Sequence, residues 1–589
     1  MTDKKWLIKD KYPQDFADKL PGYHPAILQL LFDRGLDTQK KIDEFLNPDY
    51  TQDLHDPFLF QDMAKAVDRI SNAVKNQEKV LLHGDYDADG VTASVLMEKT
   101  LRELGINKIE VFIPHREIDG YGLNMSTVEK IIADKFNLVI TLDCGITNVE
   151  PIKRLKEAGI DTIVVDHHLQ GDELPKAVAI LDCSLKREEY PFKKLSGVGM
   201  AFKLAQALFR SQPNPSKYEA FEKWLLDLVA IGTIGDVSPI LGENRTLVKY
   251  GLMVLNKTPR KGLQELIHTC RLSNGQELAA DLPLGAELYN LNIYNISYQI
   301  VPRINAAGRV DHANLAYKLL TTQDELEAIA LARDIHEKNL ERQKITDQIM
   351  EEAKEILGKA TDKNKILIAS KEGWSPGIVG LVAGKLKDEF CRPVILFAVE
   401  GDKYLGSGRS IEEFNITDAL HKCDDFLEHY GGHSQACGLA IKGDDNYEKF
   451  VEKMTQLANK ELKDVELIPT LKIDTEVELK DLDWELWDEL EKFEPFAEAN
   501  PKPLFLIKNV KINNIETVGK NADHLRFYLS QKSLIRKAIS FGTAEKWTKQ
   551  VKVGDRVDVV VEFEVNEWNG NRELQLKVID LKHSRSNLS

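Results

Sequence analysis

The sequence has 589 residues, of which 43% are hydrophobic and 29% are charged, and its formal net charge is −16 at pH 7. This composition is typical of a globular protein long enough for about four domains. The negative charge argues against a protein that coats nucleic acid through a broad basic surface, although it allows a narrow basic channel beside an acidic site.

The chain has none of the usual signals for export or membrane insertion. No apolar run reaches the roughly 18 residues that suggest a transmembrane helix, and residues 1–20 are charged throughout, unlike a signal peptide. The six cysteines form no Cys-x-x-Cys pair, which argues against a zinc knuckle or a disulfide framework. We therefore expect a cytoplasmic protein with reduced thiols and no membrane contact.

The first expected elements are two helices, at residues 25–34 and 39–45, in an N-terminal segment that spans residues 1–58. From residue 59 to 310, short apolar runs alternate with helix-like stretches such as 92–104 and 149–158. This alternation predicts βαβ units and a mostly parallel sheet. The expected strands are 79–83, 109–113, 138–142, 162–165 and 177–181.

A connector and two further domains follow. The connector, residues 311–360, contains a stretch at 322–357 without glycine or proline, which predicts one long helix between two lobes. A second α/β domain at 361–462 opens with an expected strand at 365–369. In the last domain, 463–589, two alternating runs flank Asn569-Gly570, which is typical of a β-hairpin and favours a small barrel or sandwich.

The densest group of chemically active side chains is His83-x-Asp85-x-Asp87-x-Asp89, between an expected strand and an expected helix. Carboxylates at a spacing of two residues repel one another, and a multivalent cation is the simplest compensation. An EF-hand calcium loop also begins Asp-x-Asp-x-Asp-Gly, but it follows a helix and needs Glu at its twelfth position, where this chain has Leu96. We therefore reject an EF-hand here.

Two more expected strands end in similar groups, since Asp143 follows one of them and Asp166-His167-His168 follows the next. A single Asp at a strand end is often a cap or turn residue, and a single His is usually structural. Three such endings are different, because a parallel sheet brings the carboxyl ends of its strands to one edge. Asp236, after an apolar run at 225–234, is a fourth candidate, with a helix cap as the alternative.

Carboxylate and imidazole ligands without thiolate favour manganese or magnesium over structural zinc. Two such cations about 3.5–4 Å apart are a common device for displacement at phosphorus. The sequence therefore predicts two divalent cations, Mn²⁺ or Mg²⁺, at this sheet edge. Asp143 enters from a separate strand and is the expected bridge between them.

Together these motifs resemble the DHH phosphoesterase superfamily, and within it the exonucleases that degrade single-stranded DNA from the 5′ end. The resemblance covers roughly residues 60–589 and extends to segments at 113–122, 197–199, 235–237, 302–309, 406–409 and 431–433. It implies a DHH lobe at 59–310, a DHH-associated lobe at 361–462 and an OB fold at 463–589. The expected fold is thus two α/β lobes joined by a long helix, followed by an OB-like β-barrel.

The resemblance also implies roles for single residues. His168 would contact the scissile phosphate rather than a metal, and Asp85 is either a ligand or a neighbour of the ligands. His83 matches a metal-binding histidine of family II pyrophosphatases, but exonucleases of this type need not use it, so both readings stay open. The metal ligands that the resemblance implies, which are also expected to act in catalysis with His168, are Asp87, Asp89, Asp143, His167 and Asp236.

The nucleic acid is expected to be held by arginines, which grip phosphate bidentately, and by aromatic stacking. We expect the arginines in glycine- or proline-containing turns, and Arg409 in a turn that presents N–H groups to an anion. The alternatives are surface ion pairs for the arginines and core packing for Tyr121. The expected nucleic-acid contacts are Arg116, Tyr121, Arg303, Asn305, Arg309, Ser407, Arg409 and His433.

The expected function is hydrolysis of single-stranded DNA from the 5′ end to 5′ mononucleotides in DNA repair and recombination. The alternatives are a phosphodiesterase of short oligonucleotides or cyclic dinucleotides, and a non-catalytic DNA-binding scaffold. Small-substrate enzymes of this class typically need only the two lobes, and a decayed scaffold would not keep every candidate ligand. The resemblance alone suggests a helicase and a single-strand-binding protein as collaborators, and we expect a monomer.

Overall fold

The computed structural model describes residues 4–115, 120, 122–273, 291–310, 314–358, 363–519, 521–568 and 571–584. The chain forms two compact units, and each is discontinuous in sequence. Unit 1 contains Met1–Asp53, Pro239–Arg245 and Ile468–Ser589, and unit 2 contains Leu54–Ser238 and Thr246–Leu467. Among the described residues, no helix combines the length and the apolarity needed to cross a bilayer.

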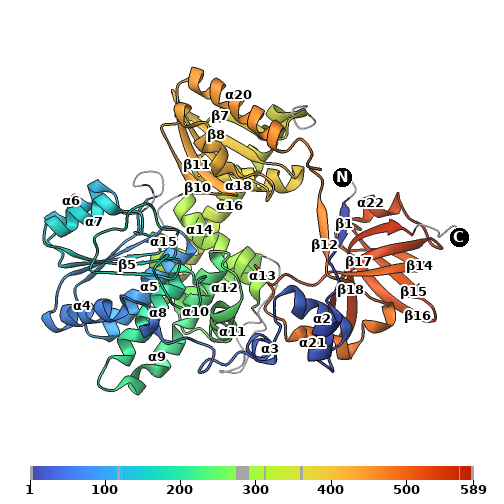
Figure 1. Cartoon of the computed structure of the whole chain (residues 1–589), viewed down its shortest axis with the longest axis horizontal. Helices are drawn as coiled ribbons and strands as arrows, with labels where there is room; N and C mark the ends of the chain where they lie inside the picture. The colour runs from blue at the N-terminus through green and yellow to red at the C-terminus, as the bar shows by residue number, and fades with distance from the viewer. Residues whose placement is uncertain are drawn as a thin grey trace. The chain divides into compact units, whose positions relative to one another are not determined.

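The first lobe of unit 2 is built on a five-stranded parallel sheet in the order β3-β2-β4-β5-β6, as the alternating pattern predicts. Helices α6 and α7 cover one face, and α4, α5 and α8 cover the other (Figure 1). Because both faces are buried, the strands are apolar on both sides. The elements are α4 (Met63–Asn76), β2 (Val80–Gly84), α5 (Ala88–Glu103), β3 (Ile109–Phe112), α6 (Met125–Ala133), β4 (Leu138–Leu142), α7 (Val149–Glu157), β5 (Asp161–Asp166), β6 (Ala179–Asp182) and α8 (Gly197–Arg210).

The strand register places the candidate ligands at one edge of this sheet. Gly84 of β2 lies opposite Leu142 of β4, which in turn lies opposite Val165 of β5. Each of these residues stands at or one residue before the carboxyl end of its strand, so the motifs that follow them begin side by side. Helix α5 starts at Ala88, four residues before the expected helix at 92–104, because the Asp87 side chain caps its first turn.

Helices complete the first lobe and lead to the second. The apolar run before Asp236 is helix α10, and Asp236 is its C-cap residue. The expected long helix is confirmed as α16, which begins after the N-cap residue Asp324. The helices are α9 (Glu219–Trp224), α10 (Leu226–Gly235), α11 (Gly242–Leu255), α12 (Lys261–Ser273), α13 (Ile293–Asn295), the π-helical turn Ile296–Ile300, α14 (Val301–Val310), α15 (Asn314–Thr321) and α16 (Glu325–Leu357).

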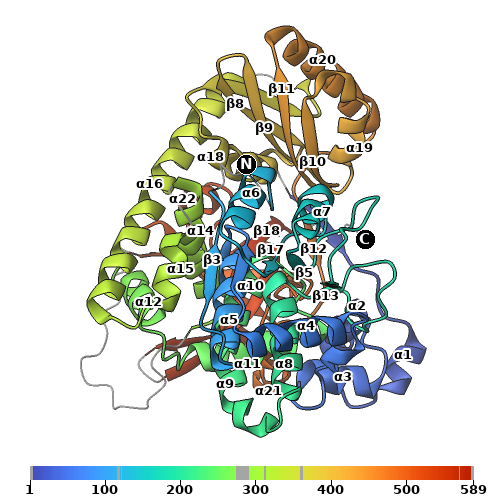
Figure 2. The same cartoon turned by 90° about the vertical axis from the view of Figure 1, so that its left-hand side faces the viewer.

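The second lobe has a mixed five-stranded sheet in the order β10-β11-β9-β8-β7, in which only β7 and β8 are parallel. Helix α18 covers one face, and α19 and α20 cover the other (Figure 2). The elements are β7 (Leu367–Glu372), α18 (Pro376–Phe390), β8 (Val394–Glu400), β9 (Lys403–Arg409), α19 (Ile416–His421), β10 (His429–His433), β11 (Ala436–Lys442) and α20 (Asp444–Glu461).

The expectation that the substrate arginines lie in turns is wrong for the three that the structure describes. Arg409 is the last residue of strand β9, and Arg303 and Arg309 lie on helix α14. Gly406 is also a residue of strand β9, and a Cβ there would come within 2.4 Å of the buried Phe397 ring, so the glycine makes room for packing and does not mark a turn. Pro302 lies just after the π-helical turn Ile296–Ile300, where the regular α-helical hydrogen-bond pattern is already interrupted.

Unit 1 contains the expected OB-like barrel. Five strands, β14, β15, β16, β18 and β17, form a sheet that the pairing of β14 with β17 closes. Strands β17 and β18 pair up to Trp568 opposite Asn571, which confirms the expected hairpin, although Asn569 and Gly570 lie outside the described residues. The elements of this part of the chain are β12 (Thr470–Ile473), β13 (Thr475–Glu476), α21 (Trp484–Glu491), β14 (Phe505–Val518), β15 (His524–Gln531), β16 (Leu534–Ser540), α22 (Ala544–Thr548), β17 (Arg556–Trp568) and β18 (Asn571–His583).

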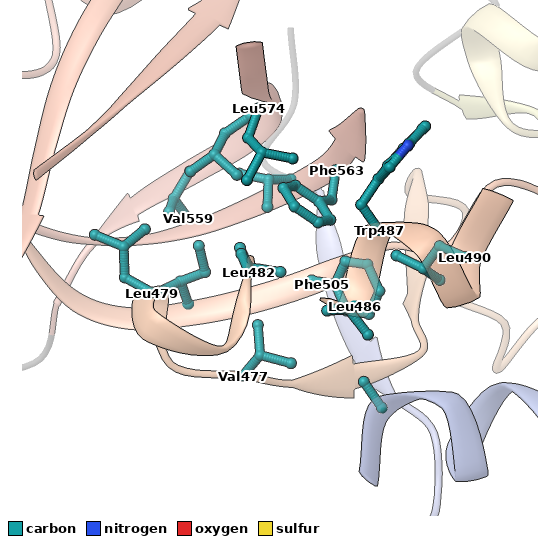
Figure 3. Packing of buried hydrophobic residues seen from close by; sticks show 14 of the residues in the cluster. Val477, Leu479, Leu482, Leu486, Trp487, Leu490, Phe505, Val559, Phe563 and Leu574 are labelled. Atoms are coloured by element: carbon teal, nitrogen blue, oxygen red, sulfur yellow. The ribbon is translucent and has the colours of Figure 1, made fainter. Parts of the chain in front are cut away.

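The first residues of the chain pack in the same unit as the barrel. Strand β1 (Lys5–Ile8) pairs in parallel with β12, and the helices α1 (Gln14–Lys19), α2 (Pro25–Asp33) and α3 (Gln39–Leu46) add to the hydrophobic core around the barrel. In that core, Phe563 and Leu574 of the barrel lie near Trp487 of α21 (Figure 3). The buried Arg245 guanidinium stacks on the Phe45 ring and donates hydrogen bonds to four backbone carbonyl groups, so it ties separate segments of this unit together.

Candidate metal centre

The turn between β2 and α5 is held in place by hydrogen bonds to its carboxylates. Asp87 Oδ1 accepts the backbone N–H groups of Asp89 and Gly90, at 2.9 and 3.2 Å. The Asp89 carboxylate accepts the N–H groups of Gly197 and Val198 at 2.6 and 2.8 Å, at the start of helix α8. The N-terminus of a helix favours negative charge, so α8 helps to keep a buried carboxylate at this position.

The predicted ligands converge at this edge of the sheet. They form three groups of three residues, called trios below, and the three ligand atoms of each trio lie within 4.8 Å of one another. Nε2 of His167 lies 3.1 Å from Asp143 Oδ1, 3.8 Å from Asp236 Oδ1 and 3.9 Å from Asp89 Oδ2. The trios are Asp85, Asp87 and Asp143; Asp89, His167 and Asp236; and Asp143, His167 and His168.

The trio of Asp85, Asp87 and Asp143 and the trio of Asp89, His167 and Asp236 share no residue, so each could hold one cation. Asp143 belongs to the first and touches His167 of the second, which is the geometry expected of a bridging carboxylate. A side chain at position 197 would place its Cβ 2.4 Å from Asp143 Oδ1, so Gly197 allows helix α8 to approach the bridge. The glycine at this position thus has a role in the site.

The electrostatics of the site favour bound cations. Burial, with the nearby charges of Asp236 and Asp87, raises the pKa of Asp89 to about 7. Burial and the neighbouring carboxylates also raise the pKa of Asp143 well above its ordinary value. For His167, burial would lower the pKa, but Asp236 and Asp89 outweigh this and raise it. Hard divalent cations would supply the positive charge that these oxygen and imidazole groups require, so the residues fit such ions.

Of the two residues whose role stayed open, Asp85 lies in a trio and His83 does not. The His83 ring is fully buried, and its Nδ1 lies 3.7 Å from the Cys144 thiol. Asp85 is also buried, and its carboxylate is grouped with those of Asp87 and Asp143. The geometry therefore favours Asp85 over His83 as the residue that completes the first trio.

Asp166 has a role that the sequence analysis missed. It is completely buried, and its carboxylate accepts the backbone N–H groups of Ile146, His167 and His168 and a 2.7 Å hydrogen bond from His168 Nδ1. Burial would raise its pKa, but the hydrogen bond and charge of His168 lower it. Asp166 therefore fixes the His168 ring, with Nδ1 turned inward. The only signal in the sequence is its place at the end of a strand before two histidines.

The structure describes only Arg303, Asn305 and Arg309 of the nucleic-acid contacts that are expected before the second lobe. Arg116 and Tyr121 lie outside the described residues. Arg303 is buried and donates hydrogen bonds to the Gln299 carbonyl and the His336 ring, at 2.8 and 3.3 Å. The other two contact neighbouring elements, since Arg309 donates to the Gly377 carbonyl at 3.0 Å and Asn305 accepts the Ala88 N–H at 2.7 Å.

The expected contacts of the second lobe lie together at one end of its sheet. Arg409 Nη1 donates to Ser407 Oγ at 3.2 Å and to the Gly408 carbonyl at 2.8 Å. Across the sheet, Arg409 of β9 pairs with Ala436 of β11, which pairs with His433 of β10. Ser407, Arg409 and His433 therefore gather at one sheet end.

Family models match three parts of the chain: the "DHH family, N-terminal domain" at residues 79–233, the "DHHA1 domain" at 363–460 and the "RecJ OB domain" at 473–580. The chain is 37% identical to the single-stranded-DNA-specific exonuclease RecJ of Bacillus subtilis over 558 residues, which cover 94% of this chain and 68% of the relative. It is 30% identical to the Haemophilus influenzae RecJ over 576 residues, 94% of this chain and 96% of that one. The chain belongs to the RecJ family.

Solved RecJ structures share this fold. The crystal structure of RecJ in complex with Mn²⁺ from Thermus thermophilus matches with a TM-score of 0.79 and 26% identity, over 99% of this chain and 80% of that one. An exonuclease RecJ bound to manganese matches with a TM-score of 0.58 and 31% identity, over 69% of this chain and 98% of the other. The predicted fold, two α/β lobes and an OB-like barrel, is confirmed, and it is the RecJ fold.

Proposed function

We propose that the protein is a metal-dependent exonuclease that hydrolyses single-stranded DNA from its 5′ end and releases 5′ mononucleotides, in DNA repair and recombination. The observation that carries the proposal is the pair of ligand trios that meet at Asp143 and His167. Its RecJ relatives are named single-stranded-DNA-specific exonucleases, which supports the substrate class. Every predicted ligand is present, which argues against a non-catalytic scaffold.

The metal centre would hold two divalent cations, Mn²⁺ or Mg²⁺, with Asp143 between them. When bound, these cations would lower the pKa of an attacking water and stabilise negative charge on the phosphate. Solved RecJ structures with Mn²⁺ and with Mg²⁺ support this choice of metals. The residues that would hold the cations are Asp85, Asp87 and Asp143 on one side and Asp89, His167 and Asp236 on the other.

His168 would act on the scissile phosphate directly. Its Nδ1 is bound to Asp166, which leaves Nε2 for the substrate, and about a third of its side chain is exposed. Burial would lower its pKa, but the hydrogen bond and charge of Asp166 raise it, which favours the protonated form of the ring. A protonated Nε2 donates a hydrogen bond to a phosphate oxygen and stabilises the charge that grows there.

The second lobe would anchor the 5′ end of the strand. Ser407, Arg409 and His433 offer a hydroxyl, a guanidinium and an imidazole at one end of its sheet, and guanidinium groups bind phosphate well. An anchor at a set distance from the metal centre would place the first phosphodiester bond at the cations. This arrangement would release one nucleotide in each cycle.

The OB barrel offers a further contact for the strand. A pocket of about 390 Å³ in unit 1 is lined by Trp484, Tyr528, Arg536, Lys537 and Arg572, among others. Trp484 is 42% exposed, and the Arg572 guanidinium lies 5.6 Å from its ring centre. Exposed aromatic rings with cations nearby bind single strands without sequence preference. This domain favours a polynucleotide substrate over cyclic dinucleotides, which the two lobes alone would accommodate.

The remaining features of the proposal concern the setting in which the protein would act. The protein would act in the cytoplasm as a monomer, on single strands that a helicase exposes and that a single-strand-binding protein covers. The two partners are suggested by the family resemblance alone.

A nuclease assay with Mn²⁺ and end-labelled substrates tests the proposed function. We expect a 5′-phosphorylated single strand to lose mononucleotides from its 5′ end, whereas blunt duplex of the same sequence is degraded much more slowly. Dinucleotides and cyclic dinucleotides serve as competing substrates. Equal rates on duplex would contradict the strand selectivity, and a preference for dinucleotides would favour the small-substrate alternative. Absence of hydrolysis by a protein with two bound Mn²⁺ ions would favour a scaffold.

A further inference from the structure

One backbone N–H at the start of helix α5, that of Ala88, forms no hydrogen bond with the side chain of the N-cap residue Asp87. The first N–H groups of a helix have no partner within it. Asp87 Oδ1 accepts those of Asp89 and Gly90, but the N–H of Ala88 donates to Asn305 Oδ1 at 2.7 Å. Ala88 is only 1% exposed, so water does not take the place of this acceptor. The hydrogen bond thus joins the metal-binding turn to a residue 217 positions further along the chain.

Asn305 is itself held firmly against this turn. It lies on helix α14, whose Arg303 side chain donates to the His336 ring of the long helix α16. At position 235, a Cβ would lie 3.0 Å from the Ala88 Cβ and 3.3 Å from a methyl carbon of Val301, so Gly235 lets the start of α14 pack close to the turn. The acceptor on Asn305 is therefore fixed by tertiary packing rather than by local sequence.

We propose that Asn305 is a positioning residue of the metal centre, which keeps the Asp87–Asp89 turn in shape by accepting the Ala88 N–H. Without this acceptor, a buried N–H would lack a hydrogen bond, which is unfavourable. The Asp87 carboxylate, which already accepts the N–H groups of Asp89 and Gly90, is the acceptor in the turn that could replace Asn305 at the Ala88 N–H. Its rotation toward Ala88 would take an oxygen away from the cation. This role differs from the contact with nucleic acid that the family resemblance suggests for Asn305.

Asn305→Ala tests this proposal through metal binding without any DNA. Isothermal titration calorimetry should give a Mn²⁺ affinity about 10–100-fold weaker than that of the wild type for at least one of the two ions, as is usual when a group that orients a ligand is lost. The affinity for single-stranded DNA in EDTA should not change. In turnover, the half-saturating Mn²⁺ concentration should rise, and saturating Mn²⁺ should restore much of kcat.

The matched control is Asn256→Ala. Asn256 Oδ1 also accepts a distant backbone N–H, that of Leu291 at 2.8 Å, but Asn256 belongs to none of the ligand trios. Its loss should lower thermal stability to a similar degree and leave the Mn²⁺ affinity unchanged. Asn305→Asp keeps the acceptor oxygen and should bind Mn²⁺ at least as well as the wild type, so it tests the proposal even where the alanine variant fails to fold.

Two results would overturn the proposal. One is a wild-type Mn²⁺ affinity in Asn305→Ala together with weaker binding of single-stranded DNA, which would make Asn305 a substrate contact. The other is an Asn305→Asp variant that folds but loses Mn²⁺ affinity. Relevance to DNA hydrolysis depends on the proposed function, but the calorimetric result does not, so the two can fail separately.

Discussion

Asp143→Asn is expected to lower kcat on single-stranded DNA by at least about 10³-fold, because a carboxylate between two cations contributes several kcal/mol to stabilisation of the transition state. Asp143 is grouped with Asp85 and Asp87 and lies 3.1 Å from His167, so it contacts both of the trios that share no residue. Asparagine is the right replacement because Asp143 has a φ of 62°, a left-handed conformation that asparagine tolerates and alanine does not.

Metal binding and thermal stability give a second test of the Asp143→Asn substitution. In EDTA, Asp143→Asn should unfold at a higher temperature than the wild type, because burial and nearby carboxylates make the Asp143 charge unfavourable. Added Mn²⁺ should stabilise the wild type and have little effect on the variant. Asp62→Asn is the matched control, since Asp62 is a buried carboxylate that pairs with Arg187, outside the trios. Near-normal turnover in a folded Asp143→Asn protein would exclude the bridging role.

Asp166→Asn should lower kcat by up to about 10⁴-fold, the size of the effect when the aspartate that orients the histidine of a Ser-His-Asp triad is replaced by asparagine. The amide would present an N–H group to His168 Nδ1, which disfavours the present tautomer and ring orientation. The Mn²⁺ affinity should fall much less than in Asp143→Asn, because Asp166 is not a member of the trios. Steady-state kinetics at saturating Mn²⁺ measure the effect.

A double variant shows whether Asp166 acts through His168. If it does, adding His168→Ala to Asp166→Asn should cost little further activity, because residues that act as a unit are not additive. If the fold-losses in kcat of the two single variants multiply in the double variant, the two residues act independently. Circular dichroism would check that the fold is intact, since Asp166 also accepts three backbone N–H groups.

The metal centre could be predicted because a parallel sheet turns sequence order into spatial proximity. Strands β2, β4 and β5 are short and apolar, and each ends next to a carboxylate or imidazole group. Once their carboxyl ends are placed at one edge, Asp87, Asp143 and His167 must converge, and the observed register brings them together. Asp236 could be named from its motif only, since it caps a helix rather than ending a strand.

Other features depend on long-range packing that leaves no local pattern. Asn305 meets Ala88 across 217 positions, and strand β1 near the start of the chain pairs with the distant strand β12. Arg303 and Arg309 were expected in turns because glycine and proline flank them, but the neighbouring helices impose helix α14 on that segment. Asp166 was overlooked because its partners are mostly backbone N–H groups, which no side-chain motif reveals.

The central claim is that separate strand ends hold a pair of hard cations around Asp143. Anomalous scattering at the manganese edge, from crystals of the whole chain grown with Mn²⁺, tests it most directly. The account predicts two peaks about 3.5–4 Å apart, one beside Asp85 and Asp87 and one beside Asp89 and Asp236, with Asp143 in contact with both. A single peak, or peaks away from Asp143 and His167, would contradict the two-cation centre.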